Sequence, residues 1–326
     1  MLDAIRWVKP ALASKDIVLA MKFYLFSGGY VHAHDGRMTA AHPVEVQEEF
    51  LVAGEAFEAL LQRMPGEPLL QRKEDNIIVK SGRYRGNVQT LDPALWGYPP
   101  PAGEWEKLPA DVVDALRTVA PFVSDNATKP WALCACLRGG YIYASDNIVV
   151  VRRALPIHLE RDILIPFWAL QFILSKPAPP VSWMVADNFI AFCWENGAWM
   201  RTQVFTEQYP EQVDGIIAKA AELASTTPAL AVTPDWVNGF DYVAGLSDGI
   251  LRIEPDKIRG QRDKLETVVE VTTPVTKETI WDARFATPAL KLAKTWYPDG
   301  WPAPCYFEGS DHTKTKVDGV ILGRRI

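Results

Sequence analysis

The stretch Ser27-Gly28-Gly29-Tyr30-Val31-His32-Ala33-His34-Asp35-Gly36 decides the fold, because it recurs as Arg138-Gly139-Gly140-Tyr141-Ile142-Tyr143-Ala144-Ser145-Asp146-Asn147. The two stretches match almost position for position. Each follows a short apolar run, at residues 23–26 in the first copy and 133–137 in the second. Apolar runs joined by a glycine turn are typical of antiparallel hairpins. The chain therefore predicts an internal structural repeat.

Helices are predicted in three pairs along the chain. The first member of each pair keeps apolar residues at helical spacing, at residues 3–12, 111–120 and 235–244. The second members are predicted at residues 55–64, 167–176 and 288–297. A proline, which cannot continue a helix, follows each second member at the same distance: Pro65, Pro177 and Pro298. The separation within a pair barely changes, so the repeat is predicted to be threefold.

A further hairpin is predicted after each second helix. The first two combine residues 69–72 with 76–80 and 181–185 with 189–194, and the third copy is looser, through residues 305–308 and 317–322. Segments rich in proline and glycine, 92–109 and 210–228, separate the units. The predicted domains are therefore residues 1–96, 97–211 and 212–326. Residues 212–224 are predicted to form a linker helix, because they do not fit the repeat spacing.

The composition excludes several classes of protein. A hydrophobic content of 48% is enough for packed cores. The most apolar stretch, residues 163–174, is short and broken by Pro166 and Gln171, so we expect a cytoplasmic protein without a membrane partner. A net charge of −6 excludes coating of nucleic acid by bulk attraction, so any contact with DNA must be local or topological. Four scattered cysteines predict buried, reduced thiols.

The repeat resembles the bacterial DNA polymerase III β sliding clamp family over nearly the whole chain. Four segments carry the resemblance, in the family's order: Phe50-Leu51-Val52-Ala53 with Phe57, Ser81-Gly82-Arg83, Arg85 and Thr90-Leu91; Ala144-Ser145-Asp146 with Val149-Val150; Tyr209-Pro210; and Gly319-Val320-Ile321-Leu322-Gly323-Arg324-Arg325-Ile326. Asn147 and Ile148 replace the family's Gly-His, and the chain is somewhat shorter than typical members. A divergent member, encoded by a phage or plasmid, fits this pattern.

The resemblance implies an α+β fold of three tandem DNA-clamp domains, each with two helices on an antiparallel sheet. It implies that two chains close head to tail as a dimeric ring. Such a homodimer encircles double-stranded DNA by topology, without sequence specificity, and tethers the DNA polymerase and other partners. The chain has no Gly-Lys-Ser or Gly-Lys-Thr phosphate loop, so an ATP-driven clamp loader is expected as a separate partner. We expect no enzymatic activity and no cofactor.

The resemblance also implies three groups of functional residues. The predicted DNA-facing residues are Arg6, Lys9, Arg63, Arg83, Arg85, Arg117, Lys176, Lys291 and Lys294. The predicted pocket for partner peptides consists of Asn147, Ile148, Val149, Val320, Leu322, Arg325 and Ile326. The predicted dimer interface contains Val88, Val268 and Val269. The alternatives are a solvated helix face for the basic residues and a place in the domain's own core for the valines.

The alternative function is a metal-dependent hydrolase that uses His32, His34 and Asp35. Alternate residues of a strand face the same side, so two imidazoles can share one metal ion. However, the chain has five histidines in all, and Gly36 stands where the hydrolase motif has its last histidine. We therefore expect no metal site.

Twelve tryptophans leave open a surface that binds aromatic or carbohydrate ligands. Those in predicted helices, such as Trp7, Trp168 and Trp236, are expected in cores or interfaces. Four others lie near the connectors and are expected to pack one domain against another: Trp96, Trp105, Trp296 and Trp301.

Overall fold

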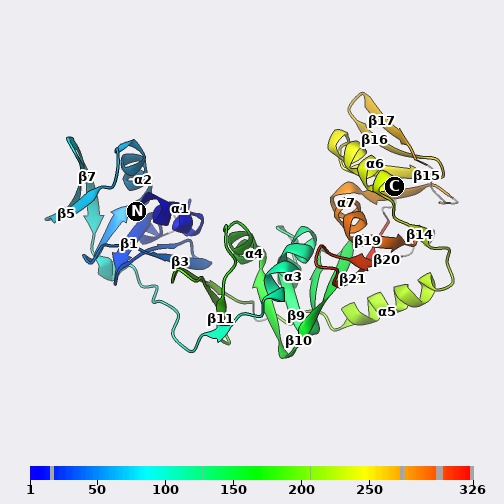
Figure 1. Ribbon diagram of the computed structural model, residues 1–326, viewed down its shortest axis with the longest axis horizontal. Coiled ribbons are helices and arrows are strands. Elements are labelled where there is room, and N and C mark those ends of the chain that lie inside the picture. Colours follow the sequence, from blue (N-terminus) through cyan, green and yellow to red (C-terminus); the bar gives the residue numbers. More distant parts are fainter. Residues whose placement is uncertain are drawn as a thin grey trace. The chain divides into compact units, whose positions relative to one another are not determined.

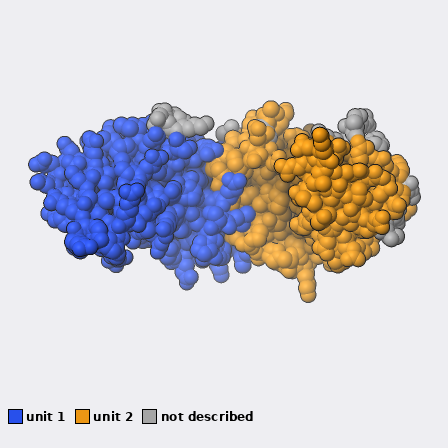
Figure 2. Space-filling view, turned by 90° about the horizontal axis from the view of Figure 1, so that it is seen from above, with its two compact units in different colours: residues 1–110, 171–204 blue, residues 111–170, 205–326 orange. Residues whose placement is uncertain are grey.

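The computed structural model describes residues 1–14, 18–126, 128–205, 207–271, 275, 277–298 and 304–323 (Figure 1). The structure is α+β, and the strand pairs are antiparallel. Two compact units are formed, residues 1–110 with 171–204 and residues 111–170 with 205–326 (Figure 2). Every helix of the described part is too short or too polar to pass through a lipid bilayer.

The first set of elements contains two helices, α1 (Leu2–Val8) and α2 (Gly54–Arg63). The strands before α2 are β1 (Phe23–Ser27), β2 (Tyr30–His34), β3 (Met38–Pro43) and β4 (Phe50–Ala53). The strands after α2 are β5 (Leu69–Lys73), β6 (Asn76–Ser81) and β7 (Tyr84–Leu91). Two short 3-10 helices, η1 (Lys9–Ala11) and η2 (Leu19–Lys22), precede β1.

The second set follows a connector that contains η3 (Pro93–Leu95) and β8 (Glu106–Lys107). Its helices are α3 (Asp111–Val119) and α4 (Phe167–Leu174), with η4 (Ala120–Phe122) and η5 (Pro130–Leu133) after α3. Its strands are β9 (Cys134–Ser145), β10 (Val149–Pro166), β11 (Ser182–Val185), β12 (Phe189–Cys193) and β13 (Trp199–Gln203).

The third set follows α5 (Gln212–Ala224) and β14 (Leu230–Ala231). Its helices are α6 (Pro234–Leu246) and α7 (Ala283–Leu292). Four strands lie between them: β15 (Ile250–Glu254), β16 (Lys257–Arg262), β17 (Leu265–Glu270) and β18 (Thr279–Asp282). Three more follow α7: β19 (Ala293–Trp296), β20 (Cys305–Ser310) and β21 (Lys316–Ile321).

The same strand pairing occurs three times. In the first set, β1 pairs with β2 and β4, and β2 pairs with β3. In the third set, β15 pairs with β16 and β18, and β16 pairs with β17. In the second set, the two halves of β9 correspond to β1 and β2, and the two ends of β10 correspond to β3 and β4. Residues 163–166 of β10 pair with 134–137, and residues 150–154 pair with 141–145. The predicted repeat is therefore present, and β15–β18 form a third copy that the sequence did not reveal.

The helices follow the predicted pairs, except that the last one is displaced. The predicted helix at residues 288–297 was wrong in its second half, because α7 ends at Leu292 and β19 follows it. The carboxylate of Asp282 accepts a hydrogen bond from the Arg284 N–H at 3.0 Å and caps α7. This cap starts the helix before Pro288, which lies inside it.

Two further strand pairs join neighbouring sets. In one compact unit β3 pairs with β13, and in the other β10 pairs with β21. The second set therefore contributes β11–β13 to one unit and β9–β10 to the other. The two compact units consequently cut across the second predicted domain, and the three domain boundaries stay a prediction.

A buried arginine holds α3, β10 and the β20–β21 turn together. The Arg153 side chain is fully buried, and its guanidinium donates to Asp111 Oδ2 at 2.6 Å and to Asp311 Oδ2 at 2.5 Å. Burial alone would raise the pKa of Asp311, but hydrogen bonds from Thr313 and Arg153 lower it to about 2. A buried charge without its partner is strongly destabilising. The conformation of the β20–β21 turn therefore depends on the ion pair between its Asp311 and Arg153 of β10.

We predict that Asp311→Asn lowers the free energy of unfolding at pH 7 by about 3–5 kcal/mol, because it leaves the Arg153 charge partly uncompensated. The Asp311 pKa is depressed on folding, so its contribution is present above pH 4 and disappears as the pH falls through about 2. Urea unfolding of the wild type and the variant at pH 7 and at about pH 2 measures the difference in the free energy of unfolding. Asp125→Asn, which removes an exposed partner of Arg284, is the matched control and should cost less than about 1 kcal/mol. Equal losses in the two variants would contradict the role given to Arg153.

Candidate functional site

Several strands have an edge without a partner among the described residues, and two of them, β17 and β7, correspond in the repeat to β3 and β13, which pair with each other. Strand β17 pairs with β16 alone. Strand β7 pairs with β6 along residues 84–89 and reaches β4 only through Thr90 and Leu91. Such edges present unpaired N–H and C=O groups, and natural proteins usually cover them. The exposed large apolar residues on these two strands are Tyr84 in β7 and Leu265 and Val268 in β17.

The three predicted interface valines differ in exposure. Val268 is 44% exposed, whereas Val88 is only 7% exposed. Val269 is half-buried and packs on α6 at Gly239. The core role that the sequence left open therefore applies to Val88 and Val269 within the single chain.

The predicted DNA-facing residues differ in their partners. Four form ion pairs with acidic side chains: Arg6 with Asp3, Lys9 with Glu58, Arg117 with Asp114, and Lys291 with Asp241. Four are exposed and form no ion pair with any described residue: Arg63, Arg83, Arg85 and Lys294. Because about half of these charges are locally compensated, the positive potential of the set is modest.

Lys176 does not belong to this exposed set. Its ammonium donates to the Trp7 carbonyl oxygen at 2.6 Å and lies 3.8 Å from the centre of the Phe172 ring. Burial lowers the pKa of Lys176 to about 8. The side chain therefore links two segments of one compact unit, and this engagement argues against the DNA-facing role predicted for it.

The predicted partner-peptide pocket contains both exposed and buried positions. Asn147 and Ile148 are exposed, and the Ile148 carbonyl accepts a hydrogen bond from the Leu322 N–H at 2.8 Å. Leu322 is itself 40% exposed, so Ile148 and Leu322 form a small apolar surface. Val149 and Val320 are buried, which is the core role left open above. Arg325 and Ile326 lie outside the described residues.

Helix α5 covers the sheet face to which Val320 belongs. It buries Val213, Ile217, Ala220 and Ala224 in one cluster with side chains of β9, β10, β20 and β21. Val320 is a member of this cluster and is 3% exposed. The predicted linker helix is therefore part of the core. The sequence indicated the helix but not its packing, because its spacing does not follow the repeat.

Polar contacts hold α5 and its connector in place. Asp214 of α5 accepts hydrogen bonds from the Tyr143 hydroxyl at 2.8 Å and from Arg152 at 3.0 Å. Arg138 donates to the carbonyl oxygen of Tyr209 at 2.7 Å. Burial, followed by the hydrogen bond to Asp214, raises the pKa of Tyr143. The hydroxyl of Tyr143 therefore stays protonated and donates to the helix.

The histidines of the hydrolase hypothesis make separate contacts. His34 Nδ1 lies 2.9 Å from Thr39 Oγ1, and His32 Nε2 lies 3.4 Å from the Ser27 carbonyl oxygen. The Asp35 carboxylate accepts from the N–H groups of Arg37 and Met38, as a turn residue does. No three His, Cys, Asp or Glu residues of the described part are grouped as metal ligands. The hydrolase alternative is unsupported.

Most tryptophans near helices and connectors lie in apolar clusters. Trp236 packs on Trp296 with ring centres 5.9 Å apart, and both are about 2% exposed. Trp96 is also buried, whereas Trp105 is 38% exposed. Trp301 lies outside the described residues. All four cysteines are free thiols, as predicted; three are buried as predicted, whereas Cys193 is partly exposed.

Comparison with solved structures decides the fold. A β clamp from Helicobacter pylori bound to a DNA ligase peptide has a TM-score of 0.78 and 15% identity, and a DNA polymerase sliding clamp from Bacillus subtilis has a TM-score of 0.80 and 14% identity. Each comparison covers 100% of this chain and 97% of the other. This chain has the β clamp fold.

A third structure with the clamp fold is the DNA polymerase III subunit β of Pseudomonas aeruginosa bound to griselimycin, with a TM-score of 0.77, 12% identity and the same coverage. No protein-family profile and no curated protein sequence matches this chain. This chain therefore shares the clamp fold with these structures at a sequence identity of 12–15%.

We predict that Ile217→Ala lowers the free energy of unfolding by about 2–4 kcal/mol, because the side chain is fully buried between α5 and the sheet. Ile216→Ala is the matched control, since Ile216 is 44% exposed, and should change stability by less than about 0.5 kcal/mol. Urea unfolding of both variants measures the difference. Similar small losses would mean that α5 does not pack on the sheet.

Proposed function

We propose that this chain is a DNA sliding clamp, a non-enzymatic processivity factor that encircles duplex DNA as a dimeric ring and tethers a polymerase. The clamp fold, which extends over the whole chain and leaves an open edge on both β7 and β17, is the observation that supports this function most directly. Pairing of β17 in one chain with β7 in another would use both edges. Two such contacts between two chains close a ring.

The internal repeat supports a specific register for this contact. In the pairs that join neighbouring sets, Thr39 lies opposite Arg201 and Val150 lies opposite Val320. Following the strand pairing of each set, the equivalent positions at the open edges are Glu266 in β17 and Asn87 in β7. We infer that these two residues lie opposite each other across the ring interface.

This register gives the exposed apolar residues of both edges a partner. It places Leu265 opposite Val88 and Tyr84 opposite Val269, so two side chains that are 51% and 45% exposed in the single chain become covered. Val88 and Val269 would thus contribute to the interface by covering Leu265 and Tyr84 of the partner chain.

The register also pairs opposite charges. It brings Glu270, the last residue of β17, next to the β6–β7 turn that contains Arg83, and an exposed pair of opposite charge contributes about 0–1 kcal/mol. Arg83 therefore serves the interface in this proposal, rather than the DNA. Two such pairs in a ring favour the head-to-tail register.

The electrostatics suit a clamp that holds DNA by topology. The net charge is −6, and several basic residues of the helices are already paired with carboxylates. Unpaired cations such as Arg63 and Lys294 can make water-mediated or transient contacts with phosphates, which carry no sequence information. Weak contacts allow sliding, because a closed ring does not need tight binding to stay on DNA.

The partner-peptide site is proposed at the apolar surface of Ile148 and Leu322. The Helicobacter pylori clamp was solved with a DNA ligase peptide, and the Pseudomonas aeruginosa clamp with griselimycin. By analogy, the polymerase and an ATP-driven loader would dock short apolar segments on this chain. Since Val149 and Val320 are buried, a peptide would contact Ile148, Leu322 and the C-terminal residues beyond them.

We predict a solution mass near twice 36.4 kDa for the wild type and near 36.4 kDa for Val268→Pro. The N–H of Val271 donates to Asp256 toward β16, so by alternation the N–H of Val268 points to the open edge. Proline at this position removes an interchain hydrogen bond and leaves the β16–β17 pairing in place. Light scattering measures the mass. When the dimer dissociates and re-forms in the presence of a nicked circular plasmid, so that rings close around the DNA without a loader, the wild type should co-elute with the plasmid in gel filtration until the plasmid is cut.

Val268→Thr keeps the N–H group and is the matched control, expected to remain dimeric and to stay on the circle. Circular dichroism checks that Val268→Pro is folded. A folded Val268→Pro dimer would contradict the proposed edge. Wild-type retention that is the same on linear and circular DNA would contradict a topological clamp.

A further inference from the structure

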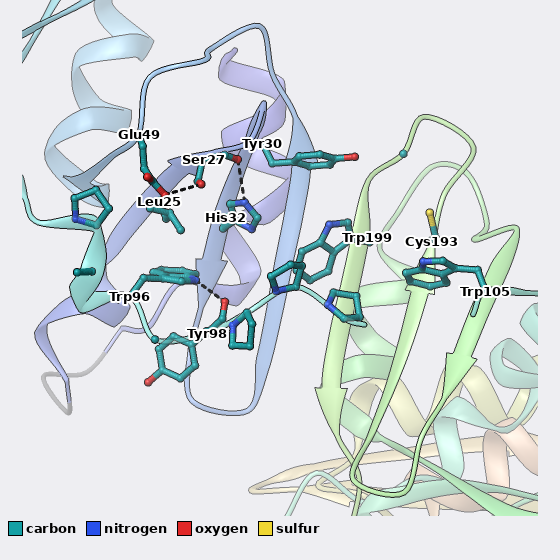
Figure 3. Close-up of a pocket in the computed structure, with 18 residues that line it drawn as sticks. Leu25, Ser27, Tyr30, His32, Glu49, Trp96, Tyr98, Trp105, Cys193 and Trp199 are labelled. Carbon is teal, nitrogen blue, oxygen red and sulfur yellow. Dashed lines mark hydrogen bonds between the residues drawn. The ribbon is translucent and has the colours of Figure 1, made fainter. Parts of the chain in front are cut away.

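A cavity of about 860 Å³ lies within the first compact unit, between strands β1, β2 and β13 and the connector that follows β7. Figure 3 shows His32 and Trp199 on the strand side, with Trp96 and Tyr98 of the connector opposite them. Cavities of this size can accept several side chains of a ligand. Nothing in the proposed clamp function uses this cavity.

The internal repeat shows what kind of object can fill such a space. The equivalents of Leu25 and His32 in the second set are Cys136 and Tyr143, which lie beneath α5. Both sheet faces also carry a buried aromatic residue of a connector, Trp96 in the first case and Tyr209 in the second. In the second set, the chain itself supplies a helix that fills the face. In the first set, Trp96 packs against Leu25 and His32, and the cavity lies beside these residues, along residues 97–105.

The lining of the cavity combines aromatic rings with a single acidic group. Five aromatic residues line it, Tyr30, Trp96, Tyr98, Trp105 and Trp199, together with a run of three prolines at residues 99–101. Burial lowers the pKa of His32 to about 4, so this ring is neutral at physiological pH. Glu49 is the one acidic residue among the described residues of the lining.

The Glu49 carboxylate is available to a ligand. Its Oε1 accepts a hydrogen bond from the Ser27 hydroxyl at 2.7 Å, and it forms no ion pair with any described residue. Arg72 lies nearby, but its guanidinium donates to the backbone carbonyl oxygen of Glu49, at 2.8 Å. A carboxylate in a cavity that is also lined by aromatic rings favours a cation, because both the carboxylate and the ring faces attract positive charge.

We propose that this cavity binds a linear segment of a partner protein through a basic side chain that pairs with Glu49 and an adjacent apolar side chain that packs between the tryptophans. The segment takes the place that α5 takes on the equivalent face of the second set. This site is separate from the surface of Ile148 and Leu322, and its use does not depend on ring closure.

The test selects random dodecapeptides displayed on phage against the full-length chain. The selected peptides should share a lysine or arginine next to an aromatic or aliphatic residue. Fluorescence polarisation then measures the affinity of a labelled peptide for the wild type and its variants. Glu49→Gln should weaken binding about three- to tenfold, and replacing the peptide's basic residue by glutamine should cause the same loss without a further loss in Glu49→Gln.

Two more variants test whether the peptide occupies this cavity. Glu48→Gln removes a neighbouring exposed carboxylate that does not line the cavity, and should leave the affinity unchanged. Trp105→Ala removes an exposed ring of the lining and should also weaken binding. Three results would overturn the proposal: no enriched peptides, peptides whose binding depends on Ile148 instead of Glu49 and Trp105, or a solution mass that changes in Trp105→Ala because a second copy occupies the cavity.

Discussion

The structure depends on antiparallel pairing at strand edges. Within the chain, the edge of one set of elements pairs with the edge of the next set twice, through β3 with β13 and through β10 with β21. The same two kinds of edge remain unpaired in β17 and β7. An exposed strand edge presents N–H and C=O groups that can pair with another strand, so a chain built this way favours assembly with a second copy. The proposed ring follows from this unfinished pairing.

The first two copies of the repeat could be predicted from sequence because their signals are local. Glycine turns after apolar runs, and prolines at a constant distance after helices, depend only on neighbouring residues. The third copy of the sheet, β15–β18, was missed because the turn between β15 and β16 is formed by Pro255 and Asp256 in place of a glycine pair. Strand pairing revealed this copy, since backbone hydrogen bonds do not require similar side chains.

The candidate site was less predictable, because its properties arise from tertiary contacts. Asn147, Ile148 and Leu322 are exposed, and their place in a peptide pocket stays a prediction. Burial of Val320 depends on α5, which does not follow the repeat spacing. The position of Lys176 at the end of the predicted helix 167–176 suggested an exposed cation, whereas in the structure its ammonium donates to the Trp7 carbonyl oxygen. The same sheet face occurs in the first and second sets, with the cavity on it in the first set and helix α5 on it in the second. One is filled by the chain, and the other is available to a partner.

Disulfide trapping around DNA tests the central claim most directly. Leu265→Cys with Val88→Cys places two thiols opposite each other only across the proposed β17–β7 interface. When these chains are dissociated, re-assembled in the presence of a closed circular plasmid and then oxidised, we expect a covalent dimer that stays with the plasmid in detergent and is released when the plasmid is cut. Tyr84→Cys in place of Val88→Cys moves the thiol about 13 Å along the strand and should not cross-link. Monomers, a ladder of longer oligomers, or a covalent dimer that does not stay with the plasmid would contradict the account.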